Sequence, residues 1–157
     1  MRRKRPDWHD YFLSIALSVS ERGTCLRRVY GAVIVKDNVI VSTGYNGGAK
    51  GGINCVDEGK CLRDEMNIPA GERYELCLAV HAEANAIINA SASDMKGAYI
   101  YIAGTQSNLE RPNCMPCLMC QRMIANAGIE KVIYYIRFGD IEILDKKDLQ
   151  IFALGGV

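Results

Sequence analysis

Residues of the types that bind zinc stand in two short stretches of the sequence. His81 precedes Glu83 by two positions, and Pro116 comes directly before Cys117, with Cys120 three positions further on. Cysteines three residues apart on a helix lie on one face, and the positive end of the helix dipole favours the thiolate that a metal needs. His81, Cys117 and Cys120 therefore predict a metal site with three protein ligands and a fourth tetrahedral position left for water.

Glu83 separates a catalytic metal site from a purely structural one. A zinc ion with an open position lowers the pKa of its bound water from ~15.7 toward ~7. A carboxylate two residues beyond a ligand can carry protons to and from that water, and its pKa rises if the pocket excludes solvent. For an amidine-like base, the chemistry would be attack of hydroxide on the carbon that bears the exocyclic amine, with Glu83 as the catalytic acid and base.

The cysteines also allow other interpretations. Cys117 and Cys120 could form a redox pair, although that leaves His81 and Glu83 without a role. Cys114 stands three residues before Cys117, and we expect it to be a loop thiol because Pro116 sets the start of the helix. If Cys114 filled the fourth position, the chain would be a non-catalytic, zinc-stabilised binding module.

The predicted elements that position these residues alternate between strands and helices. The pattern favours an α/β fold with helices on both faces of a sheet, and a first hairpin makes that sheet mixed. Long loops are expected over 44–75 and 104–113. The expected helices cover about 8–21, 80 or 81 to 90, and 116 to just before 128. The expected strands cover 31–35, 39–43, 98–103, 131–136 and 141–144. Residues 147–154 are compatible with either a strand or a helix.

Composition restricts the class of protein. The 157 residues suit one domain spanning 1–157, with 49% hydrophobic and 24% charged residues. A net charge of +1 fits a small substrate better than a nucleic acid. The basic residues 2–5 do not begin a signal peptide, because polar residues interrupt the apolar stretch that follows, and no run is long enough to span a membrane. We expect a cytoplasmic protein, where clustered cysteines bind metal more often than they form disulfides.

With these motifs, the chain resembles the deoxycytidylate (dCMP) deaminase branch of the zinc-dependent cytidine deaminase superfamily. H-x-E followed by P-C-x-x-C is the signature of zinc nucleobase deaminases. Further matching stretches are 23–27, 31–35, 44–47, 51–52, 54–59, 81–87 and 116–117. The resemblance implies a three-layer α/β/α sandwich around a mixed five-stranded sheet, and hydrolysis of dCMP to dUMP and ammonia. We also expect a homo-oligomer.

The resemblance carries over residue by residue to possible substrate contacts. Asn46 matches a position that contacts the nucleotide sugar. Arg27, with the neighbouring Arg28, is our candidate for the 5′-phosphate; the alternative is solvated surface charge.

Four cysteines outside the catalytic motif stand at or near the positions of a second, structural zinc in several family members. Four thiolates would close a tetrahedral site and give order to the glycine-rich loop. The competing interpretation is four buried thiols acting as small apolar side chains. The four are Cys25, Cys55, Cys61 and Cys77.

The chain also departs from the family pattern. A longer loop at 104–115 separates the strand from P-C-x-x-C, and Phe138 is shifted from the usual aromatic position. Ala92 stands where regulated members have a basic residue, so we do not expect feedback by nucleotide triphosphates. A tRNA adenosine deaminase is the alternative enzyme because it shares P-C-x-M-C, but it would need a basic face for phosphate contacts, and only residues 2–5 and 27–28 offer one.

Overall fold

A mixed five-stranded sheet forms the centre of the molecule, in the order β2-β1-β5-β6-β7. The computed structural model describes residues 2–106 and 112–149, except for the side chain of Phe138. β1 pairs antiparallel with β2 and β5, β5 runs parallel to β6, and β6 is antiparallel to β7. The predicted mixed sheet is confirmed. Its strands are β1 (Arg28–Lys36), β2 (Val39–Tyr45), β5 (Tyr99–Gln106), β6 (Lys131–Tyr135) and β7 (Ile141–Asp145).

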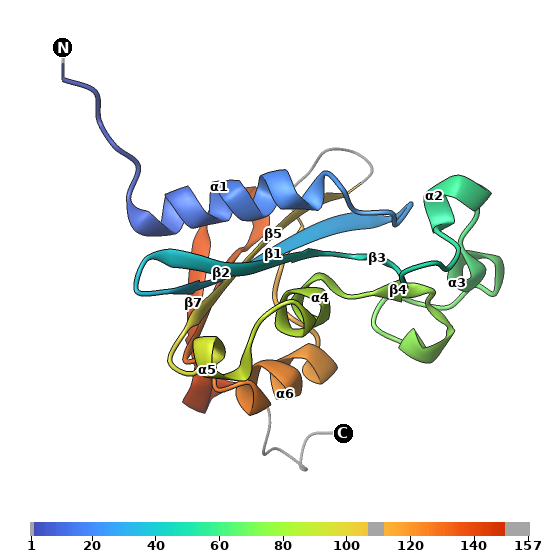
Figure 1. Ribbon diagram of the computed structural model, residues 1–157. Helices are drawn as coiled ribbons and strands as arrows, with labels where there is room; N and C mark the ends of the chain where they lie inside the picture. The colour runs from blue at the N-terminus through green and yellow to red at the C-terminus, as the bar shows by residue number, and fades with distance from the viewer. Residues whose placement is uncertain (1, 107–111, 150–157) are drawn as a thin grey trace.

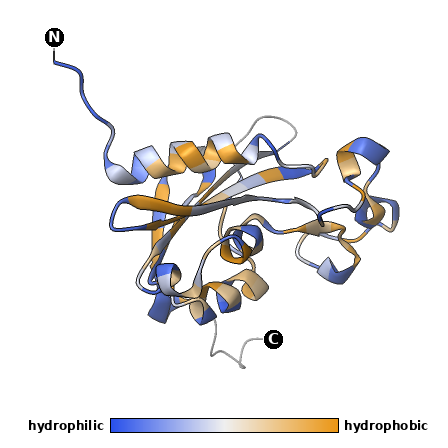
Figure 2. Cartoon of the chain, in the orientation of Figure 1, coloured by the Kyte–Doolittle hydropathy of each residue, from blue (hydrophilic) through white to orange (hydrophobic). Residues whose placement is uncertain are grey.

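Helices cover both faces of this sheet, which confirms the three-layer architecture. The long helix α1 (Trp8–Ser20) lies along one face, and α4 (Ala82–Ile88), α5 (Ala92–Met95) and α6 (Leu118–Asn126) lie on the other (Figure 1). Hydrophobic residues concentrate in the strands and on the helices, whereas the N-terminal arm is hydrophilic (Figure 2). The core therefore lies between the sheet and its two helical layers. No described helix combines the length and the apolar character that crossing a membrane requires.

Two glycines let helices approach the sheet more closely than any side chain would allow. A Cβ on Gly31 would lie 2.0 Å from the carbonyl oxygen of Ala16 in α1. A Cβ on Gly44 would lie 2.3 Å from the backbone nitrogen of Ala86 and 2.4 Å from the carbonyl oxygen of Ala82, both in α4. The second contact matters for function because α4 begins directly after His81.

The region 44–75, which we predicted to be a long loop, contains regular structure, so that prediction was wrong in part. Each helix in it is a single turn, too short to produce a hydrophobic periodicity that a sequence reader could detect. β3 pairs antiparallel with β4, which follows this region, in a separate two-stranded sheet. The elements are β3 (Gly47–Gly48), α2 (Cys55–Glu58), α3 (Leu62–Glu65), the 3₁₀ turn η1 (Tyr74–Leu76) and β4 (Ala79–Val80).

The remaining boundaries differ from prediction by a few residues. α6 begins at Leu118 rather than Pro116, and the strand expected over 98–103 continues to Gln106. α5 was not predicted; it is one turn, and its N-cap Ser91 accepts a hydrogen bond from the backbone of Asp94. The tail has 3₁₀ turns η2 (Arg137–Gly139) and η3 (Lys146–Asp148). Residues 107–111 of the inserted loop and 150–154 of the predicted tail element lie outside the described residues.

Candidate active site

The two motifs meet where helices α4 and α6 begin. His81 is the N-cap residue of α4 and Cys117 is the N-cap residue of α6. The start of α6 is fixed by the buried Gln121, whose Nε2 donates to the carbonyl oxygen of Pro116 at 2.9 Å. Both helices pack on the same face of the sheet (Figure 1), so their N-termini present His81, Cys117 and Cys120 to one point.

The distances among these three side chains suit a zinc ion. Nδ1 of His81 lies 3.6 Å from Sγ of Cys117 and 3.4 Å from Sγ of Cys120. Zn–S bonds of ~2.3 Å and Zn–N bonds of ~2.0–2.1 Å at tetrahedral angles would place a sulfur and a nitrogen about 3.5 Å apart. The donor set and these two distances therefore fit the metal.

The pKa values of the three side chains depend on one another. The pKa of Cys117 is lowered to about 4, first because the Cys120 side chain hydrogen-bonds to its sulfur and also because His81 does. The pKa of Cys120 is raised, because its proton is held by Cys117 and burial disfavours a second negative charge. The pKa of His81 is raised mainly by its hydrogen bond with Cys117. A dication satisfies all three groups at once, since metal ligands bind in their deprotonated forms.

Glu83 lies in the first turn of α4 and is almost completely buried, with 7% of its surface exposed. Burial raises the pKa of its carboxyl group, although a nearby positive charge on His81 acts in the opposite direction. A carboxyl group with a raised pKa can both accept and donate a proton near neutral pH.

Cys114 is not part of this cluster. Among the described residues, the one set of three or more metal-ligating groups within 4.8 Å of one another is His81, Cys117 and Cys120. The thiol of Cys114 is buried and donates to the carbonyl oxygen of Pro112 at 3.4 Å. Cys114 therefore does not provide a fourth metal ligand, as it would in a non-catalytic binding module.

A cavity of about 600 Å³ opens beside the three ligands. This volume is within the range of pockets that hold small molecules. Asn46, Arg27 and Arg28, our candidates for substrate contacts, all line it. Oδ1 of Asn46 accepts from the backbone nitrogen of Tyr30 at 2.7 Å, and Nδ2 donates to the carbonyl oxygen of Arg28 at 2.9 Å. Since an amide can make further bonds, one N–H and one lone pair of Asn46 are still available to a ligand.

Two further cavity residues, Arg63 and Tyr74, were not identified from the sequence. Both lie in the region expected to be a loop, at no fixed spacing from the metal motifs. A buried arginine is unusual enough to be informative, but burial could not be read from a segment without periodicity.

The four cysteines of the expected second zinc gather loosely around the short helices. Burial is the first cause that raises the pKa of Cys55, and the proximity of Cys61, Cys25 and Cys77 raises it further. Their sulfurs do not form a cluster within the 4.8 Å spacing that the His81 group shows. A second structural zinc is therefore not shown.

The fold and the site together define a class: a three-layer α/β/α protein with a three-ligand metal site and a buried acid at two helix N-termini. The family model for the cytidine and deoxycytidylate deaminase zinc-binding region matches residues 6–136. The chain therefore belongs to the family of zinc-binding cytidine and deoxycytidylate deaminases.

Individual relatives agree with this assignment. The chain is 38% identical over 135 residues to the deoxycytidylate deaminase of Mycobacterium phage D29, which covers 83% of this chain and 95% of the phage protein. It is 35% identical to the deoxycytidylate deaminase of Schizosaccharomyces pombe over 99% of this chain but only 44% of that protein, so it spans less than half of the yeast relative. The crystal structure of dCMP deaminase from the cyanophage S-TIM5 in complex with dCMP and dUMP superposes with a TM-score of 0.56 at 25% identity, over 87% of this chain and 86% of that chain.

Proposed function

We propose that this protein is a zinc-dependent hydrolase that converts dCMP and water to dUMP and ammonia. The observation that carries the proposal is the buried carboxyl group of Glu83 beside His81, Cys117 and Cys120 at one end of a nucleotide-sized cavity. The relatives named deoxycytidylate deaminase and the neighbouring structure that contains dCMP and dUMP support this choice of substrate.

His81, Cys117 and Cys120 would hold the zinc ion. When bound, zinc lowers the pKa of a water molecule and so supplies a nucleophile at neutral pH. Glu83 takes a proton from the attacking water and delivers it to the N3 ring nitrogen of cytosine. It then takes the proton of the hydroxyl group added at C4 and delivers it to the exocyclic amine, which leaves as ammonia while the C4 carbonyl forms. Its burial excludes water that would compete for these protons, and its raised pKa suits both transfers.

The opposite part of the cavity would hold the sugar and the phosphate. Asn46 has one N–H and one lone pair free of its backbone hydrogen bonds, and these suit a sugar hydroxyl. Arg28 and Arg27, the latter paired with Asp64 at 3.4 Å, bring two guanidinium groups to the cavity lining, where they can contact a phosphate group.

Further assignments extend the proposal to the rest of the chain. We treat it as a single deaminase domain that works in the cytoplasm on a free nucleotide. Its near-zero net charge supports a small substrate over a polyanion. A homo-oligomer is supported by exposed apolar side chains on the helices beside the cavity: Ile88, Leu118 and Met119.

The second, structural zinc remains a proposal for Cys25, Cys55, Cys61 and Cys77. Its support is that Cys61, Cys25 and Cys77 lie close enough to Cys55 to raise the pKa of its thiol, after burial, and that residues 49–78 have little apolar core. Four thiolates would give this region the order that its own packing does not provide.

The direct test of the proposed function is product release from dCMP, CMP, deoxycytidine and dCTP, measured side by side as ammonia and as the uracil product. We expect dCMP to be the best substrate. No release from any cytosine compound would contradict the proposal. Deamination of adenosine in RNA, with binding that weakens steeply with salt, would favour a tRNA adenosine deaminase instead.

A further inference from the structure

Arg63 is a buried cation that the proposed chemistry has not used. It lies in α3, with 6% of its surface exposed. Its Nη2 donates to the carbonyl oxygen of Pro69 at 2.7 Å, but its buried Nε has no hydrogen-bond partner. Within the described part of the chain, no carboxylate comes within 4.0 Å of its guanidinium group. Among the described residues, Arg63 therefore has no ion-pair partner.

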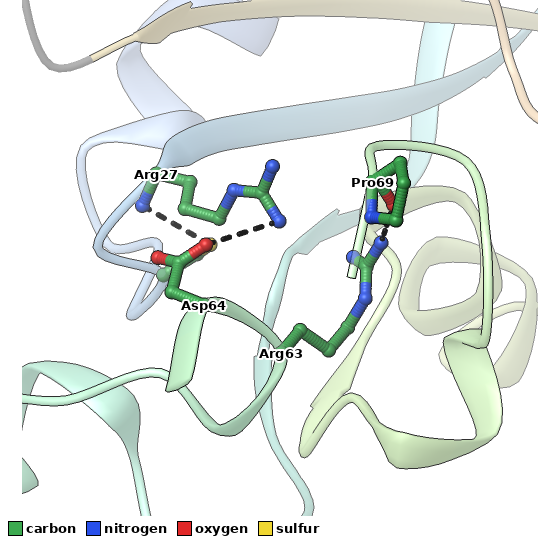
Figure 3. A network of polar contacts seen from close by, with 5 residues as sticks. Arg27, Arg63, Asp64 and Pro69 are labelled. Atoms are coloured by element: carbon green, nitrogen blue, oxygen red, sulfur yellow. Dashed lines mark hydrogen bonds and ion pairs between the residues drawn. The ribbon is translucent and has the colours of Figure 1, made fainter. Parts of the chain in front are cut away.

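The neighbouring arginine on the same wall differs in this respect. Arg27 pairs with Asp64 at 3.4 Å, and Figure 3 shows this pair beside Arg63, whose guanidinium group turns toward Pro69 instead. Asp64 is the next residue after Arg63 in α3, yet it neutralises Arg27 rather than Arg63. An incoming anion would have to displace Asp64 from Arg27, whereas Arg63 needs no such exchange.

Arg63 also lies near the metal site. Its guanidinium carbon is 4.9 Å from the centre of the Tyr74 ring, and that ring meets the ring of His81 edge-on, with the ring centres 4.9 Å apart. Arg63, Tyr74 and His81 all line the cavity. One aromatic ring therefore separates a cationic group from the proposed zinc ligand, much as a pentose separates the base of a nucleotide from its phosphate.

Burying a charged side chain without a partner is costly, so buried charges in proteins are paired or bind a ligand. A guanidinium group is weakly hydrated, stacks on aromatic rings and binds phosphate with two parallel hydrogen bonds. We propose that Arg63, held over Tyr74, binds the phosphate of the substrate and makes the site selective for a nucleoside monophosphate over the free nucleoside. This inference rests on the proposed function, and it names the residue on which substrate selection depends.

The competing explanation is that Arg63 only holds its own loop together through Pro69 and Tyr74. The two explanations differ in what happens to a ligand that lacks a phosphate. A loop that loses its shape weakens binding of dCMP and deoxycytidine alike, whereas loss of a phosphate contact weakens binding of dCMP alone.

The test compares the binding of dCMP and of deoxycytidine, measured by calorimetry on zinc-loaded protein made inactive by Glu83→Gln, with and without Arg63→Gln. Glutamine keeps an N–H donor but removes the charge. Because hydrogen bonds to charged groups change affinity by about 10- to 100-fold, we expect dCMP to bind at least ~10-fold more weakly to the variant, while deoxycytidine binds within ~2-fold of the parent value. The matched control is Arg73→Gln, an exposed arginine of the same region that pairs with Glu75; it should leave both affinities unchanged.

Equal weakening of both ligands in Arg63→Gln, or no change in either, would overturn the proposal. If that variant does not fold, Arg63→Met decides, since it keeps an apolar stem beside Tyr74 but removes the charge; a parent-like ratio of the two affinities would again overturn the proposal. In the protein that carries Glu83→Gln alone, equal affinity for dCMP and deoxycytidine is also a contradiction. Because these are binding measurements, selection of dCMP through Arg63 in a protein that releases no ammonia in its unmodified form would refute the proposed function alone.

Discussion

The two ends of the cavity are built in different ways. At the metal end, α4 and α6 pack on the sheet, and the buried residues of α4 are three alanines and Glu83. At the other end, between residues 49 and 78, the buried residues are Cys55, Cys61 and Arg63, and none of them is aliphatic. The metal end is therefore held by ordinary hydrophobic packing, whereas the loop end depends on thiols and on a buried cation.

Because the two ends are built differently, we expect the metal end to control turnover and the loop end to control stability and ligand binding. A rigid site on helix N-termini can position a proton carrier accurately, and changes there should affect turnover more than folding. The loop end lacks its own apolar core, so changes there should affect stability and ligand binding first. Substitutions at the two ends can be ordered by the size of the effect that this difference predicts.

The largest effect should follow Glu83→Gln at the metal end. Removing the proton carrier should lower kcat by at least ~100-fold, the low end for loss of general acid–base catalysis. Zinc content, measured by elemental analysis, should not change, because His81, Cys117 and Cys120 remain. Turnover near the parent value would refute the role of Glu83.

The stability of the same variant provides a check with a defined sign. Burial raises the pKa of Glu83, so the folded protein holds this proton more tightly than the unfolded chain does. The protein then loses stability as pH rises above the ordinary value of 4.5 through the folded-state pKa. Glutamine removes that penalty, so the free energy of unfolding of the variant at neutral pH should equal or exceed that of the parent. A lower value would mean that the charge of Glu83 supports the fold.

The next largest effect is expected at the loop end, from Cys55→Ser. If the four thiols bind zinc, this change should release one of two metal equivalents and lower Tm by at least ~5 °C, at ~2–4 °C for each kcal/mol in a chain of this length. The control is Cys114→Ser, a buried cysteine outside both groups whose hydroxyl can keep the hydrogen bond to Pro112. One zinc per chain in the parent protein would contradict the second site.

A change of intermediate size should follow Gly44→Ala, which tests the packing of the metal end. The new Cβ would meet the backbone of α4 at 2.3 Å, so the helix must shift. Overpacking of this kind costs about 1–3 kcal/mol, and turnover should fall with it because α4 carries Glu83. Denaturant unfolding and kcat measure the two effects.

The matched control for this variant is Gly51→Asn at the loop end. Gly51 has a positive φ of +79° but nothing within 4 Å of its Cβ position, and asparagine tolerates this backbone conformation. Gly51→Asn should change neither the free energy of unfolding nor kcat appreciably. If Gly44→Ala were equally neutral, α4 would not depend on its close approach to the sheet.

The smallest effect should come from a position that belongs to neither end. Lys131 and Asp145 form an exposed ion pair at 3.2 Å between β6 and β7. Asp145→Asn should reduce the free energy of unfolding by no more than ~1 kcal/mol, because solvent screens such pairs. A larger loss, measured by denaturant unfolding, would show that the sheet edge contributes more to stability than the core packing suggests.

The sequence was informative where a pattern repeats and uninformative where it does not. Alternation and helical periodicity predicted the sheet, α1 and the two helices whose N-termini carry His81 and Cys117. The one-turn helices α2 and α3 have no period to detect. Arg63 and Tyr74 were missed for the same reason, since only the folding of this region brings them beside His81. The ligand motifs were found because zinc demands fixed residue types at short spacings.

A crystal structure of the zinc-loaded protein, with the metal located by its anomalous scattering, would decide whether the metal site is catalytic. We expect zinc bound by Nδ1 of His81 and by the sulfurs of Cys117 and Cys120, with a water molecule as the fourth ligand in contact with the Glu83 carboxyl group. A fourth ligand from the protein, such as Cys114, or a Glu83 side chain turned away from the metal would contradict this expectation.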